Sequence, residues 1–209
     1  RIFTLLKKLQ IDDNTVVFFT SDNGPHQEGG HQHEFFDSNG PLTGYKRSMH
    51  DGGIRVPLLV RWPGKIKAGS VSAHPSAFWD FMPTACDIAQ LPKPESFGTG
   101  TERGSDGISY LPTLQGAGSK QGTHEYLYWA SQEGATAVGM RMGNWKLVKY
   151  RKARKRGTEA RKQKEADESG DDWRLYDLSA DIGEKNDISD AHPNVVQKML
   201  ALLKTDGLL

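Results

Sequence analysis

Residues 16–57 read VVFFTSDNGPHQEGGHQHEFFDSNGPLTGYKRSMHDGGIRVP, and the rest of the chain is organised around this stretch. The apolar, β-rich run at 16–20 has no alternating pattern, which predicts a strand buried on both faces. The run ends abruptly at residues 21–24, SDNG. Ligands of open α/β sheets bind beyond the carboxyl ends of the strands, so we expect Asp22 and Asn23 to lie where a ligand binds.

A simple turn is the alternative interpretation of residues 22–24, because Asn-Gly is a strong hairpin signal. A hairpin requires a second strand within a few residues, and the sequence at 24–30, GPHQEGG, does not form one. From these residues alone, the ligand site and the turn both stay open.

Lys46 extends the pattern beyond a single turn. It lies in GYKR, residues 44–47, and is followed by DGGIRVP at 51–57 and WPG at 62–64. The predicted strand, SDNG and these three segments follow one another in an order that resembles the type I sulfatases of the alkaline-phosphatase-like superfamily. The family pattern is S-D-N-G, a loop containing Gly and His, G-x-K, [DE]-G-G-x-R-x-P and W-P-G. Several motifs in the correct order are far more specific than one tripeptide.

The resemblance implies roles for individual residues. Asp22 and Asn23 would bind Ca²⁺, and Lys46 would be catalytic and contact the sulfate of the substrate. The chemistry agrees, because calcium prefers hard oxygen ligands such as a carboxylate and an amide oxygen. A lysine ammonium is a mobile point charge that suits a tetrahedral oxyanion.

The resemblance also implies a formylglycine nucleophile, made from a cysteine in a C-[PS]-x-[AP]-R context. Cys86 is the single cysteine and is followed by DIAQ, which does not fit, so we interpret it as a small apolar core residue. Residue 1 is Arg rather than Met, and apolar residues at helical spacing in 2–9 lead directly into the strand. We therefore expect the nucleophile, the remaining metal ligands and the rest of a parallel sheet in an upstream part of the same protein.

Three histidines, His26, His31 and His33, lie close together in the loop, with two glutamates among them. Imidazole binds zinc, copper or nickel, but the spacing matches no strong zinc signature and no cysteine is nearby. Solvent-facing histidines are the plain alternative. Sulfatases build pocket walls from this loop, so a third interpretation is implied by the resemblance. In it, His31 contacts the substrate, and His26 is a weaker candidate.

Other loop residues allow further expectations. Phe35 and Phe36 are expected to anchor the loop to the core. Arg47 follows Lys46 directly and is either a second anion contact or a surface arginine beside the site.

The predicted fold class is α/β. Residues 1–115 form the C-terminal part of an alkaline-phosphatase-like sulfatase domain, and 124–209 form a small α+β subdomain with an antiparallel sheet and a terminal helix. The first part contains a second strand at 54–62 and a helix at 77–90 that begins or restarts at Pro83. In the second part the expected strands are 126–129, 135–142, 145–150 and 173–178, and the expected helix is 192–204. Segments DGISYLPTL (106–114), RMGNWKL (141–147) and LYDL (175–178) also resemble sulfatase segments.

Composition excludes several classes of protein. Of 209 residues, 25% are charged and the net charge is +1, so no overall field indicates a nucleic-acid partner. No apolar run approaches the roughly 18 residues of a membrane span, and one cysteine excludes an internal disulfide framework. These residues contain no signal-peptide pattern, which says little because we expect an upstream part. The resemblance alone implies a periplasmic or secreted location.

The resemblance implies hydrolysis of a sulfate ester, with a sulfated carbohydrate favoured over a simple aryl sulfate and with no turnover by this chain alone. One alternative is a phosphate or phosphonate ester hydrolase of the same superfamily, which often prefers transition metals and histidine ligands. The other is a non-catalytic module that binds an anionic glycan through the basic part of 151–172. That charged stretch is otherwise a solvated extension whose basic and acidic halves partly neutralise each other.

Overall fold

The computed structural model describes residues 1–93, 106–133, 135–151 and 172–209. By its internal contacts the chain divides into two compact units, one of residues 1–20 and 57–124, the other of residues 21–56 and 125–209. A compact unit need not be an independent domain, so the assignment of domains at 1–115 and 124–209 stays a prediction. Most of the charged stretch 151–172 lies outside the described residues.

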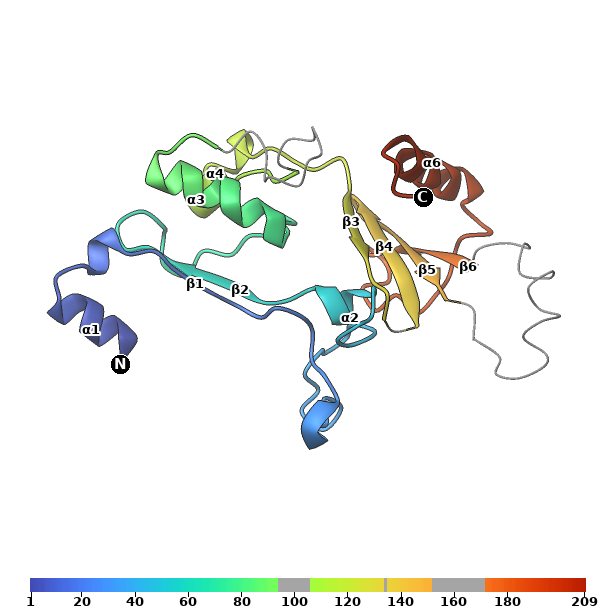
Figure 1. Cartoon of the computed structure of the whole chain (residues 1–209), viewed down its shortest axis with the longest axis horizontal. Coiled ribbons are helices and arrows are strands. Elements are labelled where there is room, and N and C mark those ends of the chain that lie inside the picture. Colours follow the sequence, from blue (N-terminus) through green and yellow to red (C-terminus); the bar gives the residue numbers. More distant parts are fainter. Residues whose placement is uncertain (94–105, 134, 152–171) are drawn as a thin grey trace. The chain divides into compact units, whose positions relative to one another are not determined.

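The first unit begins with helix α1 (Ile2–Lys8), a 3₁₀ turn (Asp12–Asn14) and strand β1 (Val17–Thr20) (Figure 1). β1 pairs antiparallel with β2 (Leu58–Arg61). The two terminal guanidinium nitrogens of Arg61, Nη1 and Nη2, donate to the Asp12 carboxylate at 2.8 Å, which joins the 3₁₀ turn to β2. The second strand begins later than predicted, because a short helix ends at Ile54 and Pro57 has no N–H for a sheet ladder.

β1 is not buried on both faces, and this prediction is wrong for the described chain. The side chains of Phe19 and Leu59 are 67% and 59% exposed. Burial on both faces requires a covering layer on each side of a sheet. Among the described residues, the one aromatic contact found from β1 joins Phe18 to Phe81, whose ring centroids lie 5.2 Å apart. No residue of α1 is buried either.

The helical part of the first unit comprises a 3₁₀ turn (Phe78–Asp80), α3 (Phe81–Ala89), α4 (Leu111–Leu114) and a 3₁₀ turn (Gly118–Lys120). The helix predicted near 77–90 is confirmed, with Pro83 in its first turn, and Cys86 is buried as expected. The buried carboxylate of Asp80 accepts hydrogen bonds from the N–H groups of Ala77 and Ile108 and contacts His124 Nε2 at 2.8 Å. This carboxylate therefore joins three separate segments of the unit.

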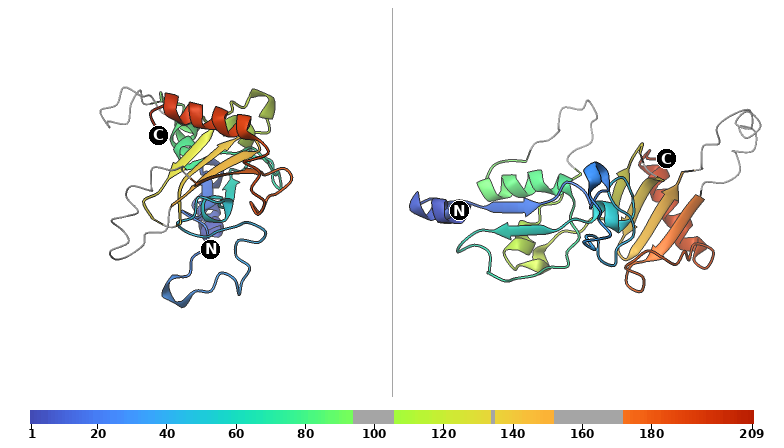
Figure 2. Two further views of the ribbon diagram at one scale, coloured as in Figure 1. Left: turned by 90° about the vertical axis from the view of Figure 1, so that its right-hand side faces the viewer. Right: turned by 90° about the horizontal axis from the view of Figure 1, so that it is seen from below.

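The second unit contains the predicted antiparallel sheet and terminal helix. The strands are β3 (Leu127–Ala130), β4 (Thr136–Met142), β5 (Trp145–Tyr150) and β6 (Asp172–Asp177), paired in that order. Helix α6 (Pro193–Thr205) lies across one face of the sheet (Figure 2). The core between them is formed by Met140, Leu147, Leu175, Met199 and Leu203. The α+β architecture is thus confirmed.

The other face of this sheet is covered by the chain segment before and through the short helix α2 (Asp51–Ile54). Side chains alternate between the two faces of a strand, so Val148 faces away from α6 and packs against Met49 and Tyr176. The Met49 N–H donates to the Thr136 hydroxyl at 2.8 Å. The SDNG-to-DGG stretch is therefore built onto the C-terminal sheet.

Candidate functional site

Backbone contacts bring the SDNG and GYK motifs together. The Gly24 N–H donates to the Gly53 carbonyl oxygen at 2.9 Å, and the Lys46 N–H donates to the Pro25 carbonyl oxygen at 2.8 Å. A Cβ atom at Gly24 would overlap the carbonyl oxygen of Gly52, so only glycine permits this approach. The SDNG and GYK motifs are therefore neighbours in space.

Asp22 and Asn23 lie next to this contact. Asp22 is exposed and Asn23 is half-buried. The Asn23 side-chain N–H donates to the Gly24 carbonyl oxygen at 2.8 Å, and the Ser21 hydroxyl donates to the Asn23 carbonyl oxygen at 2.9 Å. The carbonyl oxygen is the acceptor of the Asn23 side chain, so it is the atom that can bind a cation.

Lys46 faces the histidine loop. Its Nζ atom lies 3.1 Å from Oε2 of Glu28, and the Lys46 side chain is 32% exposed. Arg47, which has a positive φ of 74°, forms ion pairs with Glu28 and Glu133. Hydrogen bonds from Lys46 and Arg47 hold the pKa of Glu28 below its usual range. Two cations and two carboxylates thus form one surface network, and a substrate role for Arg47 stays a prediction.

The loop histidines do not share one environment. The rings of His26 and His31 lie 5.0 Å apart, and His31 stacks on Phe36 at 5.8 Å. His33 is buried beside Tyr45, with a ring separation of 4.8 Å, so it is not a solvent-facing residue. Over the ranges that the structure describes, no group of three or more His, Cys, Asp or Glu residues could hold a metal ion. A transition-metal site in this loop stays an untested alternative.

The prediction that Phe35 and Phe36 anchor the loop to the core is wrong. They are 77% and 65% exposed. Their rings pack edge-to-face on each other at 4.9 Å, and Phe36 also contacts His31. The two phenylalanines thus order the loop locally rather than attach it to the core.

Sequence reasoning missed a buried charged cluster behind α2. Lys146 Nζ donates to Asp51 Oδ1 at 2.7 Å and lies 3.6 Å from Glu184 Oε1, and the Lys146 and Glu184 side chains are fully buried. A signal was present in the sequence WKLVKY at 145–150. The two-residue period of a strand puts Lys146 on the same face as Val148, where a charge requires a buried partner.

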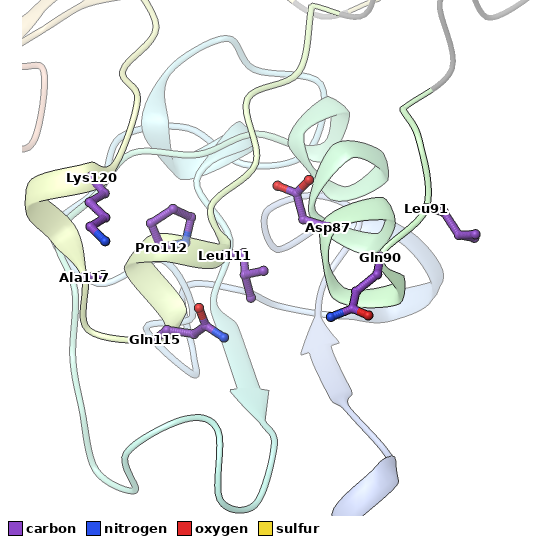
Figure 3. A pocket seen from close by; sticks show the side chains of 8 residues that line it. All are labelled: Asp87, Gln90, Leu91, Leu111, Pro112, Gln115, Ala117 and Lys120. Carbon is purple, nitrogen blue, oxygen red and sulfur yellow. The ribbon is translucent and has the colours of Figure 1, made fainter.

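A pocket of about 370 Å³ lies within the first unit, between α3 and α4 (Figure 3). Its lining residues are Asp87, Gln90, Leu91, Leu111, Pro112, Gln115, Ala117 and Lys120. None of the predicted site residues lines it.

The described helices also include none that is long and apolar enough to cross a membrane.

Comparison with known proteins identifies the family. Residues 1–91 match the family model Sulfatase. Over 212 aligned residues the chain is 32% identical to an N-acetylgalactosamine-6-O-sulfatase of Bacteroides thetaiotaomicron, covering 98% of this chain and 38% of that protein. The chain therefore spans well under half the length of this curated relative.

Solved structures agree. The sulfatase BT33336S-sulf, from a Bacteroides thetaiotaomicron study of glycosaminoglycan metabolism, has a TM-score of 0.69 and 28% identity, covering 100% of this chain and 42% of its own. BT4656 in complex with its substrate D-glucosamine-2-N,6-O-disulfate has a TM-score of 0.65 and 25% identity, covering 99% and 36%. With the ordered motifs and the fold described above, these similarities show that the chain belongs to the type I sulfatases of the alkaline-phosphatase-like superfamily.

Proposed function

We propose that this chain supplies part of the active site of an enzyme that hydrolyses a sulfate ester of a carbohydrate. The observation that carries the proposal is the placement of Lys46 beside the SDNG motif through the Lys46–Pro25 and Gly24–Gly53 hydrogen bonds. The relatives support a carbohydrate substrate, since one is an N-acetylgalactosamine-6-O-sulfatase and another binds a disulfated glucosamine.

Lys46 is the proposed catalytic and sulfate-binding residue. Its ammonium already contacts a carboxylate oxygen of Glu28, so the same ammonium can donate a hydrogen bond to an oxygen of a sulfate group. A cation fixed beside the ester stabilises the negative charge that develops on the sulfate oxygens and on the bridging oxygen. His31, half-buried beside His26 and Phe36, is proposed to contact the sugar.

Asp22 and Asn23 fit a calcium ion. An exposed carboxylate precedes an amide whose nitrogen is engaged and whose oxygen is available, and both are hard oxygen donors. Bound Ca²⁺ would supply a positive charge that polarises the sulfate oxygens. Calcium takes six to eight oxygen ligands, so about four or more have to come from other groups. We propose that those ligands and the formylglycine nucleophile lie outside these 209 residues.

The chain alone is proposed to have no turnover. Its one cysteine, Cys86, is buried on α3 and cannot act as an exposed nucleophile. Apolar side chains such as Phe19 and Leu59 are exposed, which suits packing against a further part of the same protein. By family resemblance we also propose a periplasmic or secreted location.

The test is to assay the intact protein with 6-O-sulfated N-acetylgalactosamine and other sulfated sugars, alongside phosphate and phosphonate monoesters. Sulfate release that falls on chelation of Ca²⁺ supports the proposal. Preferential hydrolysis of the phosphate or phosphonate monoesters would instead identify a phosphate or phosphonate ester hydrolase of the same superfamily. Retention on heparin that is lost on deletion of residues 151–164, with no turnover, would identify a glycan-binding module.

A further inference from the structure

The buried cluster behind α2 brings Lys146 and Asp51 into direct contact. The side chain of Lys146 is fully buried, and that of Asp51 is 4% exposed, with their charged atoms 2.7 Å apart. Burial by itself raises the pKa of Asp51, but the charge and hydrogen bond of Lys146, together with the charges of Arg141 and Arg55, outweigh that effect and lower the pKa. The pair therefore holds a charged Asp51 carboxylate at a buried position.

Such a pair is costly to bury. The desolvation of two charges often cancels their attraction, and well-packed apolar residues of similar volume are commonly as stable or more stable. The best-attested benefit of a buried pair is a fixed register between the segments that carry it. Lys146 is on β5 and Asp51 begins α2, so the pair fixes α2 at one position on the sheet.

Other side chains near the pair also hold the start of α2 in place. The Asp51 N–H donates to Glu184 Oε2 at 2.6 Å, and His50 Nε2 shares a hydrogen bond of 2.6 Å with the Tyr150 hydroxyl. His50 Nδ1 lies 3.3 Å from Glu184 Oε1 without the alignment of a hydrogen bond. The start of α2 is therefore held by groups from β5 and from the turn that contains Glu184.

From α2 the contacts lead directly to Lys46. The Gly52 N–H donates to the Thr43 carbonyl oxygen at 2.8 Å. The backbone of Gly53 approaches the carbonyl oxygens of Tyr45 and Ser48 so closely that a Cβ at Gly53 would overlap both. Gly53 also accepts the hydrogen bond from Gly24, next to Pro25, which in turn accepts from Lys46. The same turn is also held by the ion pairs of Arg47 with Glu28 and Glu133, so the contacts with α2 are one part of its support.

We propose that Lys146 is a positioning residue for Lys46. By binding Asp51, it fixes α2 on the sheet, and α2 fixes the turn from which the Lys46 ammonium reaches the sulfate. The catalytic consequence rests on the proposed function of Lys46, whereas the structural link does not. Lys146 itself touches no substrate.

The first experiment is a double-mutant cycle in the intact protein, using the sulfated sugar that it hydrolyses. Lys146→Met is expected to lower kcat/KM by about 10- to 100-fold, the size of effect that a displacement of about 1 Å produces. In the Lys46→Ala background, the same change is expected to have no further effect beyond about twofold, because the two residues act in series. A residue that merely stabilised the fold would lower kcat/KM in both backgrounds.

Lys149→Met is the matched control, since it removes a lysine from the same strand but from a partly exposed position over Trp173. It is expected to leave kcat and KM unchanged. If Lys146→Met does not fold, Asp51→Asn replaces it, because the amide keeps the size of the side chain and removes only its charge. The same pattern of non-additivity is expected.

The second measurement does not depend on activity. In Lys146→Met, the amides of Lys46 and Gly24 are expected to exchange with solvent faster, while amides of the core beneath α6 stay protected. Equal losses of kcat/KM in both backgrounds, or unchanged exchange at Lys46 and Gly24, would overturn the proposal. If the unaltered protein releases no sulfate, the proposed function fails, and hydrogen exchange alone decides whether Lys146 positions Lys46.

Discussion

Lys46 Nζ lies 3.1 Å from Glu28 Oε2, so the proposed sulfate-binding cation already holds an anion from its own chain. Arg47 contacts the same carboxylate. A sulfate group that binds Lys46 must therefore displace Glu28 or share the ammonium with it. If Lys46 binds sulfate as proposed, Glu28 would compete with the substrate for its ammonium.

Replacing that competitor should strengthen substrate binding. Glu28→Gln is expected to lower KM by about two- to fivefold with little change in kcat, because exposed ion pairs contribute modestly. Steady-state kinetics with a sulfated sugar provides the measurement. Glu34→Gln, which neutralises another exposed carboxylate of the same loop, is the control and should change neither constant. A higher KM in Glu28→Gln would show that Glu28 assists binding instead.

The Asp51–Lys146 pair should make stability depend on pH. The pKa of Asp51 is lowered in the folded state, so its contribution is complete above the ordinary carboxyl value of about 3.9 and is lost as pH falls through the lower folded value. Asp51→Asn is expected to destabilise the protein by about 3–5 kcal/mol near neutral pH. In urea unfolding, this difference should shrink below about pH 3.9. A difference that stays constant down to pH 2.5 would contradict a charged Asp51 carboxylate in the folded state.

Gly24 should tolerate no side chain. Gly24→Ala places a methyl group against the Gly52 carbonyl oxygen, and overpacking of this kind costs about 1–3 kcal/mol. Because Asn23 and Pro25 flank this residue, calcium affinity and kcat/KM should also fall. Gly118→Ala is the matched control, since a Cβ there meets open space. Thermal unfolding and calcium titration of both variants check the prediction, which fails if they behave alike.

Cys86 should be dispensable for catalysis. It is buried on α3, and its sequence context does not suit conversion to formylglycine. Cys86→Ala is expected to cost about 1 kcal/mol of stability through the small cavity that it leaves. Its kcat, measured well below the unfolding temperature, should match that of the unaltered protein. A loss of kcat by several orders of magnitude would return Cys86 to the list of candidate nucleophiles.

Much of the second unit could be predicted from the sequence. The strands and α6 follow from two-residue and helical periodicities, and the register of β4 and β5 follows from the turn at Gly143 and Asn144. That the SDNG motif and Lys46 belong to one site could be inferred only from the order of the family motifs. Local periodicity contains no information about such contacts.

What the sequence did not predict depends on long-range partners. Lys146 and Asp51 are 95 residues apart, so nothing local indicates that they meet. Phe35 and Phe36 look like core residues by composition but find each other and His31 instead. The burial expected for Phe19 depends on layers on both faces of β1, which one strand's sequence cannot specify.

The most direct test of the central claim is to measure sulfate release from a 6-O-sulfated amino sugar by the intact protein and by Lys46→Ala. A fixed cation at the reacting group contributes about 10²- to 10³-fold to kcat. The account predicts release by the unaltered protein and a loss of that size in Lys46→Ala, with unchanged unfolding temperature. Equal release by both proteins, or none by the unaltered one, would contradict it.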